Sequence, residues 1–136
     1  MPPAGYSGTP LLKKLGIKPE MKVLVLFAPK NYFQLLQNDI TSQYISEKEI
    51  PDLVHLFAKD EFTFKVEMKR ILKLNKKNTS LIIWISWYKK NSGIVTDLTE
   101  NSIRDFALQN NLVDIKVCAI SEGWSGLKLV VPVSKR

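Results

Sequence analysis

The chain has 136 residues, 45% of them hydrophobic, and a formal net charge of +7, which suits one folded domain and excludes a disordered chain. Its single cysteine excludes an internal disulfide and is typical of a reducing compartment. No apolar run approaches the roughly 20 residues that span a bilayer, and no basic region precedes an apolar one at the N-terminus, so we expect a cytoplasmic protein without a signal peptide.

The first part of the chain predicts a short helix, a strand and a second short helix. Thr9 and Pro10 have the order of a helix cap followed by a first-turn proline, and Gly16 ends that helix. Residues 22–28 are rich in valine and leucine, which predicts a buried strand. Residues 32–37 then favour a second helix.

Residues 40–45 predict a further strand whose orientation stays open. Only residues 46–51 separate it from the apolar run 53–58, which predicts a second buried strand. A parallel crossover needs a dozen or more residues, so the 40–45 strand is short, lies at an edge or is differently oriented.

The second half predicts two helices, a third buried strand and a closing pair of strands. Asp60 can cap a helix, and Asp97 and Glu100 have capping-box spacing ahead of the next one. The early part of the first of these helices also alternates with a period of two, but its length and its position between two apolar strands favour a helix. The expected ranges are helices 61–77 and 98–110 and strands 81–87, 113–120 and 127–133, the last two joined by the turn sequence EGWSG.

Strands that alternate with helices predict an α/β fold. We expect a single Rossmann-like, three-layer domain with a mainly parallel sheet and a C-terminal antiparallel hairpin strand. Residues 1–20 would form an N-terminal capping segment, and residues 21–136 would form the sheet core.

This order of elements resembles the C-terminal half of the class I methyltransferase fold, over residues 53–133. In that fold the last strand inserts antiparallel into a Rossmann-like sheet, and a glycine-rich cofactor motif follows the first strand. Here the first strand runs into FAPKNY, which contains no glycine, so the backbone cannot approach a cofactor closely at that turn. We therefore expect no S-adenosylmethionine or dinucleotide site of the usual kind and no cofactor.

Four blocks, AGYSGTPLLKKLGIKP, DLVHLF, KKNSGIVTDLTE and VDIKVCAISEGWSGLKLV, occur in that order along the chain. They resemble a bacterial family of small proteins classed as a domain of unknown function, over nearly the whole chain. The chain departs from the family pattern at Glu20, where members often have glycine, and at Tyr88, where they often have proline. The resemblance implies no activity, so no catalytic residue is carried over from it.

Few side chains suit metal or nucleophilic chemistry. The chain has one histidine and one cysteine, so we expect no metal site. His55, within an apolar strand, is either a hydrogen-bonded core residue or a proton carrier. Cys118, in the middle of a strand beside Lys116, favours buried packing over a reactive thiol.

A candidate binding site follows from geometry, because ligands bind outside the carboxyl ends of strands in open parallel sheets. Lysines there offer positive charge to an anion, Ser-Gly turns and helix starts offer N–H donors, and aromatic rings offer flat faces. The alternative is that these are ordinary turn residues. The side chains expected at this edge are Lys30, Tyr32, Lys59, Lys89, Lys90, Ser92, Gly93, Thr96, Asp97, Glu122, Trp124 and Ser125.

A second surface lies on the predicted helix 61–77. One side of this helix combines basic residues with two apolar ones, which suits either an anionic partner or a solvated face whose first turn the N-terminal segment covers. The residues of this stripe are Lys65, Lys69, Lys73 and Lys76, with Arg70, Lys77, Phe62 and Val66 beside them.

Three functions remain open. The first is a non-catalytic domain that binds an anionic small molecule or nucleotide at the carboxyl edge. The second is a transferase-type enzyme with a non-standard cofactor site, in which Asp97, Glu122 or His55 would transfer protons. The third is a basic interaction module for nucleic acid or an acidic protein.

Overall fold

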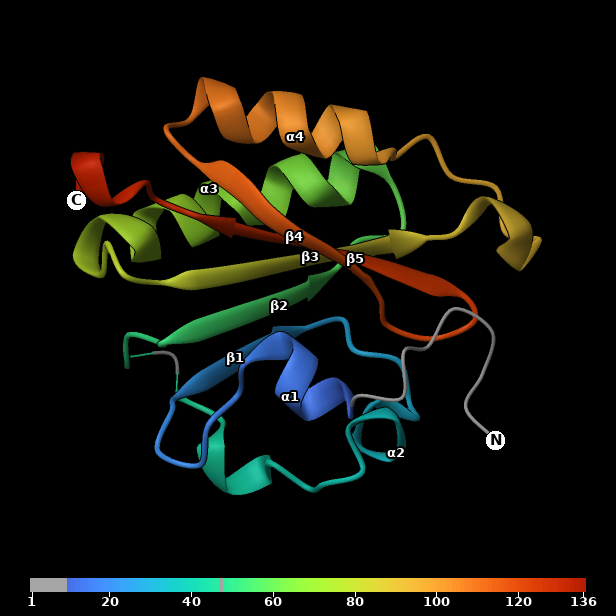
Figure 1. Ribbon diagram of the computed structural model, residues 1–136, viewed down its shortest axis with the longest axis horizontal. Coiled ribbons are helices and arrows are strands. Elements are labelled where there is room, and N and C mark those ends of the chain that lie inside the picture. Colours follow the sequence, from blue (N-terminus) through green and yellow to red (C-terminus); the bar gives the residue numbers. More distant parts are fainter. Residues whose placement is uncertain (1–9, 47) are drawn as a thin grey trace.

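The computed structural model describes residues 10–46 and 48–136 and places five strands in one open sheet (Figure 1). Strands β1, β2 and β3 are parallel, and β5 runs antiparallel between β3 and β4. The order across the sheet is β1 (Val23–Leu26), β2 (Leu53–Phe57), β3 (Ile82–Tyr88), β5 (Trp124–Val130) and β4 (Val113–Ala119).

Helices cover both faces of this sheet. The longer pair, α3 and α4, lies on one face, and the shorter pair, α1 and α2, lies on the other (Figure 1). The protein therefore has the three-layer, Rossmann-like α/β fold that the sequence predicts, including the antiparallel strand near the C-terminus. The helices are α1 (Leu11–Leu15), α2 (Tyr32–Leu36), α3 (Glu61–Lys77) and α4 (Glu100–Gln109), and short 3-10 turns cover Thr41–Gln43, Lys90–Ser92 and Val133–Lys135.

Strands β2 and β3 are buried on both faces, as their largely apolar sequences predict. Because successive side chains point to opposite faces, β2 supplies both halves of the core. Val54 and Leu56 pack towards α3 and α4, whereas Leu53 and Phe57 pack towards α1 and α2. Trp84 of β3 is fully buried and donates from Nε1 to the backbone oxygen of Leu15, 2.9 Å away, which ties α1 to the sheet.

The long helix α3 has the predicted limits and the predicted cap. The carboxylate of Asp60 accepts a hydrogen bond from the backbone N–H of Thr63 at 2.8 Å. Phe64, Met68 and Ile71 are buried against the sheet, so helical spacing outweighs the period-two alternation of the first residues.

The segment 40–45 is not a strand, and this expectation is wrong. The carboxylate of Asp39 accepts from the backbone N–H of Thr41 at 2.9 Å, which favours a turn over an extended chain. A 3-10 turn follows, and only Tyr44 forms an isolated parallel bridge, to Val23.

Strand β1 is shorter and less buried than the sequence predicts. It ends at Leu26, and Phe27 has a φ of 59° with its side chain 62% exposed. The strand lies at the edge of the sheet, where one side lacks a neighbouring strand among the described residues. At the N-terminus Gly16 closes α1 with a φ of 77°, and Pro10 occupies the cap position. The expected cap Thr9 falls outside the described residues, as does the rest of residues 1–9 of the predicted capping segment.

Strand β5 begins earlier than predicted, at Trp124, so the connection from β4 comprises only residues 120–123. Glycine is needed at Gly126, because a Cβ there would lie 2.7 Å from Cδ1 of Ile120 and 3.3 Å from the ring of Trp84. The missing side chain leaves room for Ile120 and Trp84 to pack over β5 at this point.

Candidate functional site

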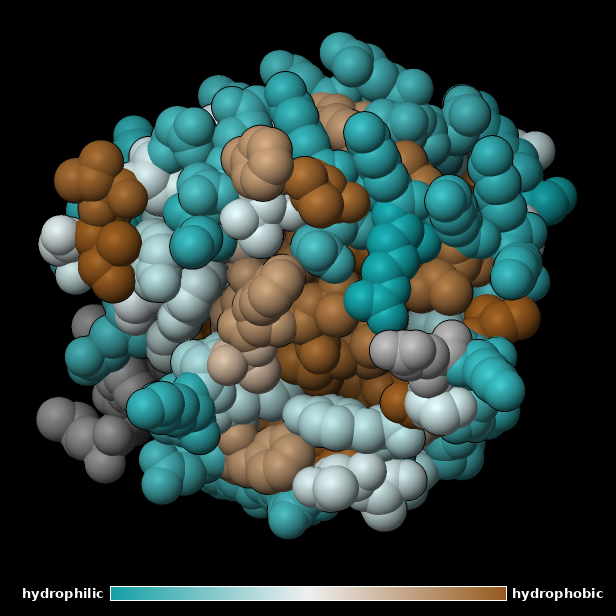
Figure 2. Space-filling model, turned by 180° about the vertical axis from the view of Figure 1, so that it is seen from behind, coloured by the Kyte–Doolittle hydropathy of each residue, from teal (hydrophilic) through white to brown (hydrophobic). Residues whose placement is uncertain are grey.

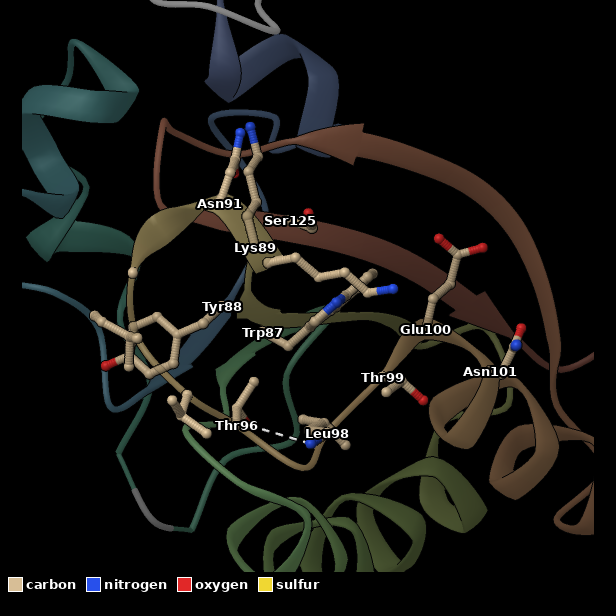
Figure 3. A pocket seen from close by; sticks show the side chains of 14 residues that line it. Trp87, Tyr88, Lys89, Asn91, Thr96, Leu98, Thr99, Glu100, Asn101 and Ser125 are labelled. Carbon is tan, nitrogen blue, oxygen red and sulfur yellow. Dashed lines mark hydrogen bonds between the residues drawn. The ribbon is translucent and has the colours of Figure 1, made fainter.

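An open cleft of about 1000 Å³ lies at the carboxyl end of β3 (Figure 3). One wall is the loop that leaves β3, and the other is the start of α4 (Figure 3). Ser125, at the start of β5, joins the lining because β5 runs antiparallel beside β3. The lining residues are Trp87, Tyr88, Lys89, Lys90, Asn91, Gly93, Ile94, Val95, Thr96, Leu98, Thr99, Glu100, Asn101 and Ser125.

Backbone contacts hold the loop after β3 in place. The N–H of Lys89 donates to the backbone oxygen of Gly123 at 3.0 Å, which joins this loop to the β4–β5 turn. A 3-10 turn follows, and Gly93 ends it with a φ of 82°, a conformation that favours glycine. The hydroxyl of Ser92 accepts from the N–H of Ile94 at 3.2 Å, so it stabilises the turn.

Several polar groups of the cleft already have structural partners. The hydroxyl of Thr96 donates to the backbone oxygen of Lys59 at 2.8 Å and accepts from the N–H of Leu98 at 3.1 Å. Glu100 forms an ion pair with Arg104 at 2.6 Å. These groups shape the cleft and are less available to a ligand.

The lysines of the cleft differ in this respect. Within the described part of the chain, neither Lys89 nor Lys90 forms an ion pair, and the side chains of Asn91 and Ser125 form no hydrogen bond. The lining therefore includes two lysines, an asparagine and a serine whose side chains have no such partner within the described residues.

Aromatic rings stack behind the cleft. The rings of Tyr88 and Trp124 lie parallel, with centroids 4.2 Å apart and planes inclined by 28°. Phe57 and Trp124 pack edge to face, with ring centroids 5.0 Å apart. Such pairs are stabilising beyond their buried area, so they fix the orientation of Tyr88 at the cleft.

The structure brings together only part of the predicted edge site. Lys89, Lys90, Gly93, Thr96 and Ser125 line the cleft. The remaining residues lie outside its lining and fall into two groups, exposed ones and ones with structural contacts. The exposed ones are Lys30, Lys59 and Glu122, and those with structural contacts are Ser92, Asp97, Trp124 and Tyr32.

Tyr32 requires a correction, because its ring is buried and cannot offer a flat face to a ligand at the surface. Its hydroxyl lies 2.8 Å from Nδ1 of His55, and Nε2 of His55 lies 2.7 Å from the hydroxyl of Ser86. All three side chains are buried, so His55 is a hydrogen-bonded core residue. Burial lowers the pKa of His55 from 6.5 to about 3 and raises the pKa of Tyr32 well above its usual range.

Asp97 does not cap α4, and this expectation is also wrong. Its carboxylate accepts from the backbone N–H of Glu61 at 2.9 Å, so it contacts the start of α3 instead. Thr99 caps α4 in a reciprocal capping box with Ser102. The helix consequently begins at Glu100, which brings Thr99, Glu100 and Asn101 into the cleft, where the sequence reasoning did not expect them. A threonine followed three residues later by serine is the signal that could have found this start.

Removal of the Thr99 hydroxyl should lower the free energy of unfolding by about 1 kcal/mol, because the N–H of Ser102 loses its acceptor. Ser102→Ala should have a similar effect. Since both side chains belong to one capping box, the double variant should lose less than the sum of the two. Urea unfolding of the parent, the two single variants and the double variant measures this coupling. Strictly additive losses of unfolding free energy would show that the capping box does not act as a unit.

Within residues 10–46 and 48–136 no group of three or more His, Cys, Asp or Glu side chains is placed to hold a metal ion, and no helix there is long and apolar enough to cross a membrane. Cys118 is half-buried on β4. Burial raises the pKa of its thiol, and the nearby Lys14 and Lys116 oppose that rise.

Comparison with solved structures finds a likeness to a crystal structure of a protein in the NADB-Rossmann superfamily from Streptococcus agalactiae. The two share 8% sequence identity and a TM-score of 0.48, over 94% of this chain and 70% of that one. No family model and no curated protein matches the chain.

Proposed function

We propose that this protein is a small, single-domain binding protein that holds an anionic small molecule or nucleotide in the cleft after β3. The observation that carries the proposal is the pair Lys89 and Lys90 at the cleft, which form no ion pair within the described residues. In this proposal it is a bacterial cytoplasmic protein of the small-protein family that its sequence blocks resemble.

Charge and shape both support an anion with a ring. The one carboxylate in the lining, Glu100, is already paired with Arg104, so it competes weakly for the lysines. Tyr88 also belongs to the lining, and its ring is held by the stack with Trp124. Asn91 and Ser125 can supply the directional hydrogen bonds that orient a ligand.

The candidate acid and base groups favour binding over catalysis. His55 is buried away from the cleft, Asp97 accepts a hydrogen bond from the N–H of Glu61, and Glu122 lies outside the lining. General acid–base catalysis needs a group within hydrogen-bond reach of the reacting atoms. None of these three meets that requirement at the cleft.

The double variant Lys89→Ala, Lys90→Ala should bind a nucleotide ligand about 30-fold more weakly, because each lost charge contact contributes roughly 1 kcal/mol. The ligand is first chosen by thermal shift from nucleotides, S-adenosylmethionine and phosphorylated metabolites. Titration calorimetry with that compound then compares the variant with the parent protein.

The matched control is Lys69→Ala, Lys73→Ala, which removes the same charge from exposed positions on α3 outside the cleft lining. It should bind the ligand within about twofold of the parent, apart from a small long-range effect that salt screens. Equal binding by the cleft variant and the parent would reject the lysine assignment. If none of the compounds in the thermal-shift panel raised the melting temperature of the protein, the binding proposal would be rejected.

A further inference from the structure

Strand β1 leaves part of its backbone without a partner. Only one side of it pairs with β2, and on the other side the described residues provide a single bridge, between Val23 and Tyr44. The oxygen of Val23 accepts from the N–H of Ile45 on that outer side, at 3.2 Å. Because backbone groups alternate along a strand, the N–H and C=O of Val25 also face outward.

The strand is short, at four residues, but it lacks the two chemical features that commonly protect a sheet edge. Exposed edges commonly carry a charged side chain or a proline, which blocks pairing with another chain. Between Val23 and Leu26 the sequence is VLVL, without either. The edge is therefore chemically open to a further strand.

An apolar surface adjoins this edge. Leu24 and Leu26 are only partly buried and face the side of the sheet that α3 covers. Phe27 follows them with its side chain 62% exposed, and on α3 Phe62 is 76% exposed and Val66 is 45% exposed. Figure 2 shows a hollowed apolar area, bordered by hydrophilic side chains, on the face behind that of Figure 1. We define the β1–α3 face by these five residues.

Basic side chains of α3 border the β1–α3 face. Phe62, Val66 and Arg70 recur every fourth residue, so they lie along one side of the helix. One of the lysines, Lys65, pairs with Glu61 at 3.3 Å, and no other ion pair involves the basic residues of α3 within residues 10–46 and 48–136. The exposed basic residues are Lys65, Lys69, Arg70, Lys73, Lys76 and Lys77.

We propose that the β1–α3 face binds an extended, acidic segment of a partner protein, which adds to β1 as a further strand. The open backbone of Val25 supplies hydrogen bonds to the main chain of that segment. Apolar side chains of the segment cover Leu24 and Leu26, and its carboxylates meet the basic residues of α3. This surface is separate from the cleft after β3.

Charge and backbone chemistry select this occupant over others. A second copy of the chain also carries a net charge of +7, and two copies joined edge to edge would bring two basic helices towards each other. Nucleic acid would match the charge of the basic residues. It cannot, however, pair with the edge strand as a further β-strand, and its phosphates would not cover the aliphatic side chains. An acidic peptide satisfies the edge, the apolar surface and the charge together.

The test uses the full chain and a labelled peptide of about eight residues, alternating valine and glutamate, within the usual length of a strand. Fluorescence anisotropy should show binding that weakens as salt increases, because the basic residues are exposed. On binding, the Val25 amide should become protected from hydrogen exchange. A peptide with lysine in place of glutamate, and one N-methylated at alternate residues, should each bind at least about tenfold more weakly.

Two variants locate the site on the protein. Val25→Pro removes an outward N–H and should weaken binding at least about tenfold, whereas Val25→Ala keeps that donor and should bind like the parent. Arg70→Glu changes an exposed side chain without touching the core and should also weaken binding about tenfold, whereas Lys13→Glu, the same charge change on α1, should not.

Three results would overturn the proposal. The first is equal binding of the glutamate and lysine peptides or of the parent and Arg70→Glu. The second is a dimer, seen by sedimentation, that Val25→Pro dissociates, which would assign the face to a second copy. The third is tighter binding of a single-stranded RNA oligonucleotide than of the peptide. If Arg70→Glu abolished that RNA binding and Val25→Pro left it unchanged, the β1–α3 face would be assigned to nucleic acid.

Discussion

Acidification from pH 6.5 to about pH 4.5 should lower the free energy of unfolding by about 2 kcal/mol, mainly through one buried side chain. His55 is fully buried between Tyr32 and Ser86, and burial lowers its pKa from 6.5 to about 3. In the unfolded chain the imidazole takes up a proton near pH 6.5, whereas in the folded protein it stays neutral. The stability from this residue is therefore complete above pH 6.5 and is lost as the pH falls towards 3.

The upper part of this pH range isolates the histidine. Hydrogen bonds lower the pKa values of Asp39, Glu49 and Asp60, so these carboxylates add their own loss of stability only in more acidic solution. Urea unfolding at several pH values between 6.5 and 4.5 measures the slope, which should approach about 1.4 kcal/mol per pH unit towards the lower end.

A variant without an ionisable ring is the control. His55→Gln cannot titrate and keeps polar atoms that can reach Tyr32 or Ser86, so its stability should change little over the same range. It should nevertheless be less stable than the parent at neutral pH, because it leaves space in the core. An equal slope in the parent and in His55→Gln would show that His55 does not control the acid response.

Replacement of Trp84 by alanine should lower the free energy of unfolding by about 4 kcal/mol. The side chain is fully buried in the centre of the sheet, and its Nε1 donates to the backbone oxygen of Leu15. The substitution leaves a large cavity and removes the hydrogen bond that ties α1 to β3. Trp84→Phe fills most of the cavity but still loses the donor, so it should lower stability by about 2 kcal/mol.

The comparison residue is Trp124, which is only partly buried and stacks on Tyr88 at the sheet rim. Trp124→Ala should be less destabilising than Trp84→Ala, because it leaves a smaller unfilled volume. Chemical unfolding monitored by far-UV circular dichroism gives all three values without relying on tryptophan fluorescence. Equal losses for Trp84→Ala and Trp124→Ala would contradict the assignment of Trp84 to the core.

The candidate site was only partly predictable from sequence. The loop after β3 was expected there because a buried apolar strand leads directly into it, and Lys89 and Lys90 do line the cleft. Tyr32 was misplaced because a short helix turns its ring into the core, where His55 can accept or donate a hydrogen bond. The register that stacks Trp124 on Tyr88 depends on how β5 pairs with β3, which no local pattern reveals.

Local signals were sufficient where one segment determined its own conformation. The largely apolar runs of β2 and β3, the helical spacing of α3 and the Asp60 cap all follow from neighbours in sequence. Tertiary structure decided the rest. It put β1 at an open edge, and it directed Asp97 to α3 because Thr99 already capped α4. The place of β1 depends on pairing with strands distant in the chain. The partner of Asp97 depends on competition between Asp97 and Thr99 for the start of α4, and hydrophobic spacing encodes neither.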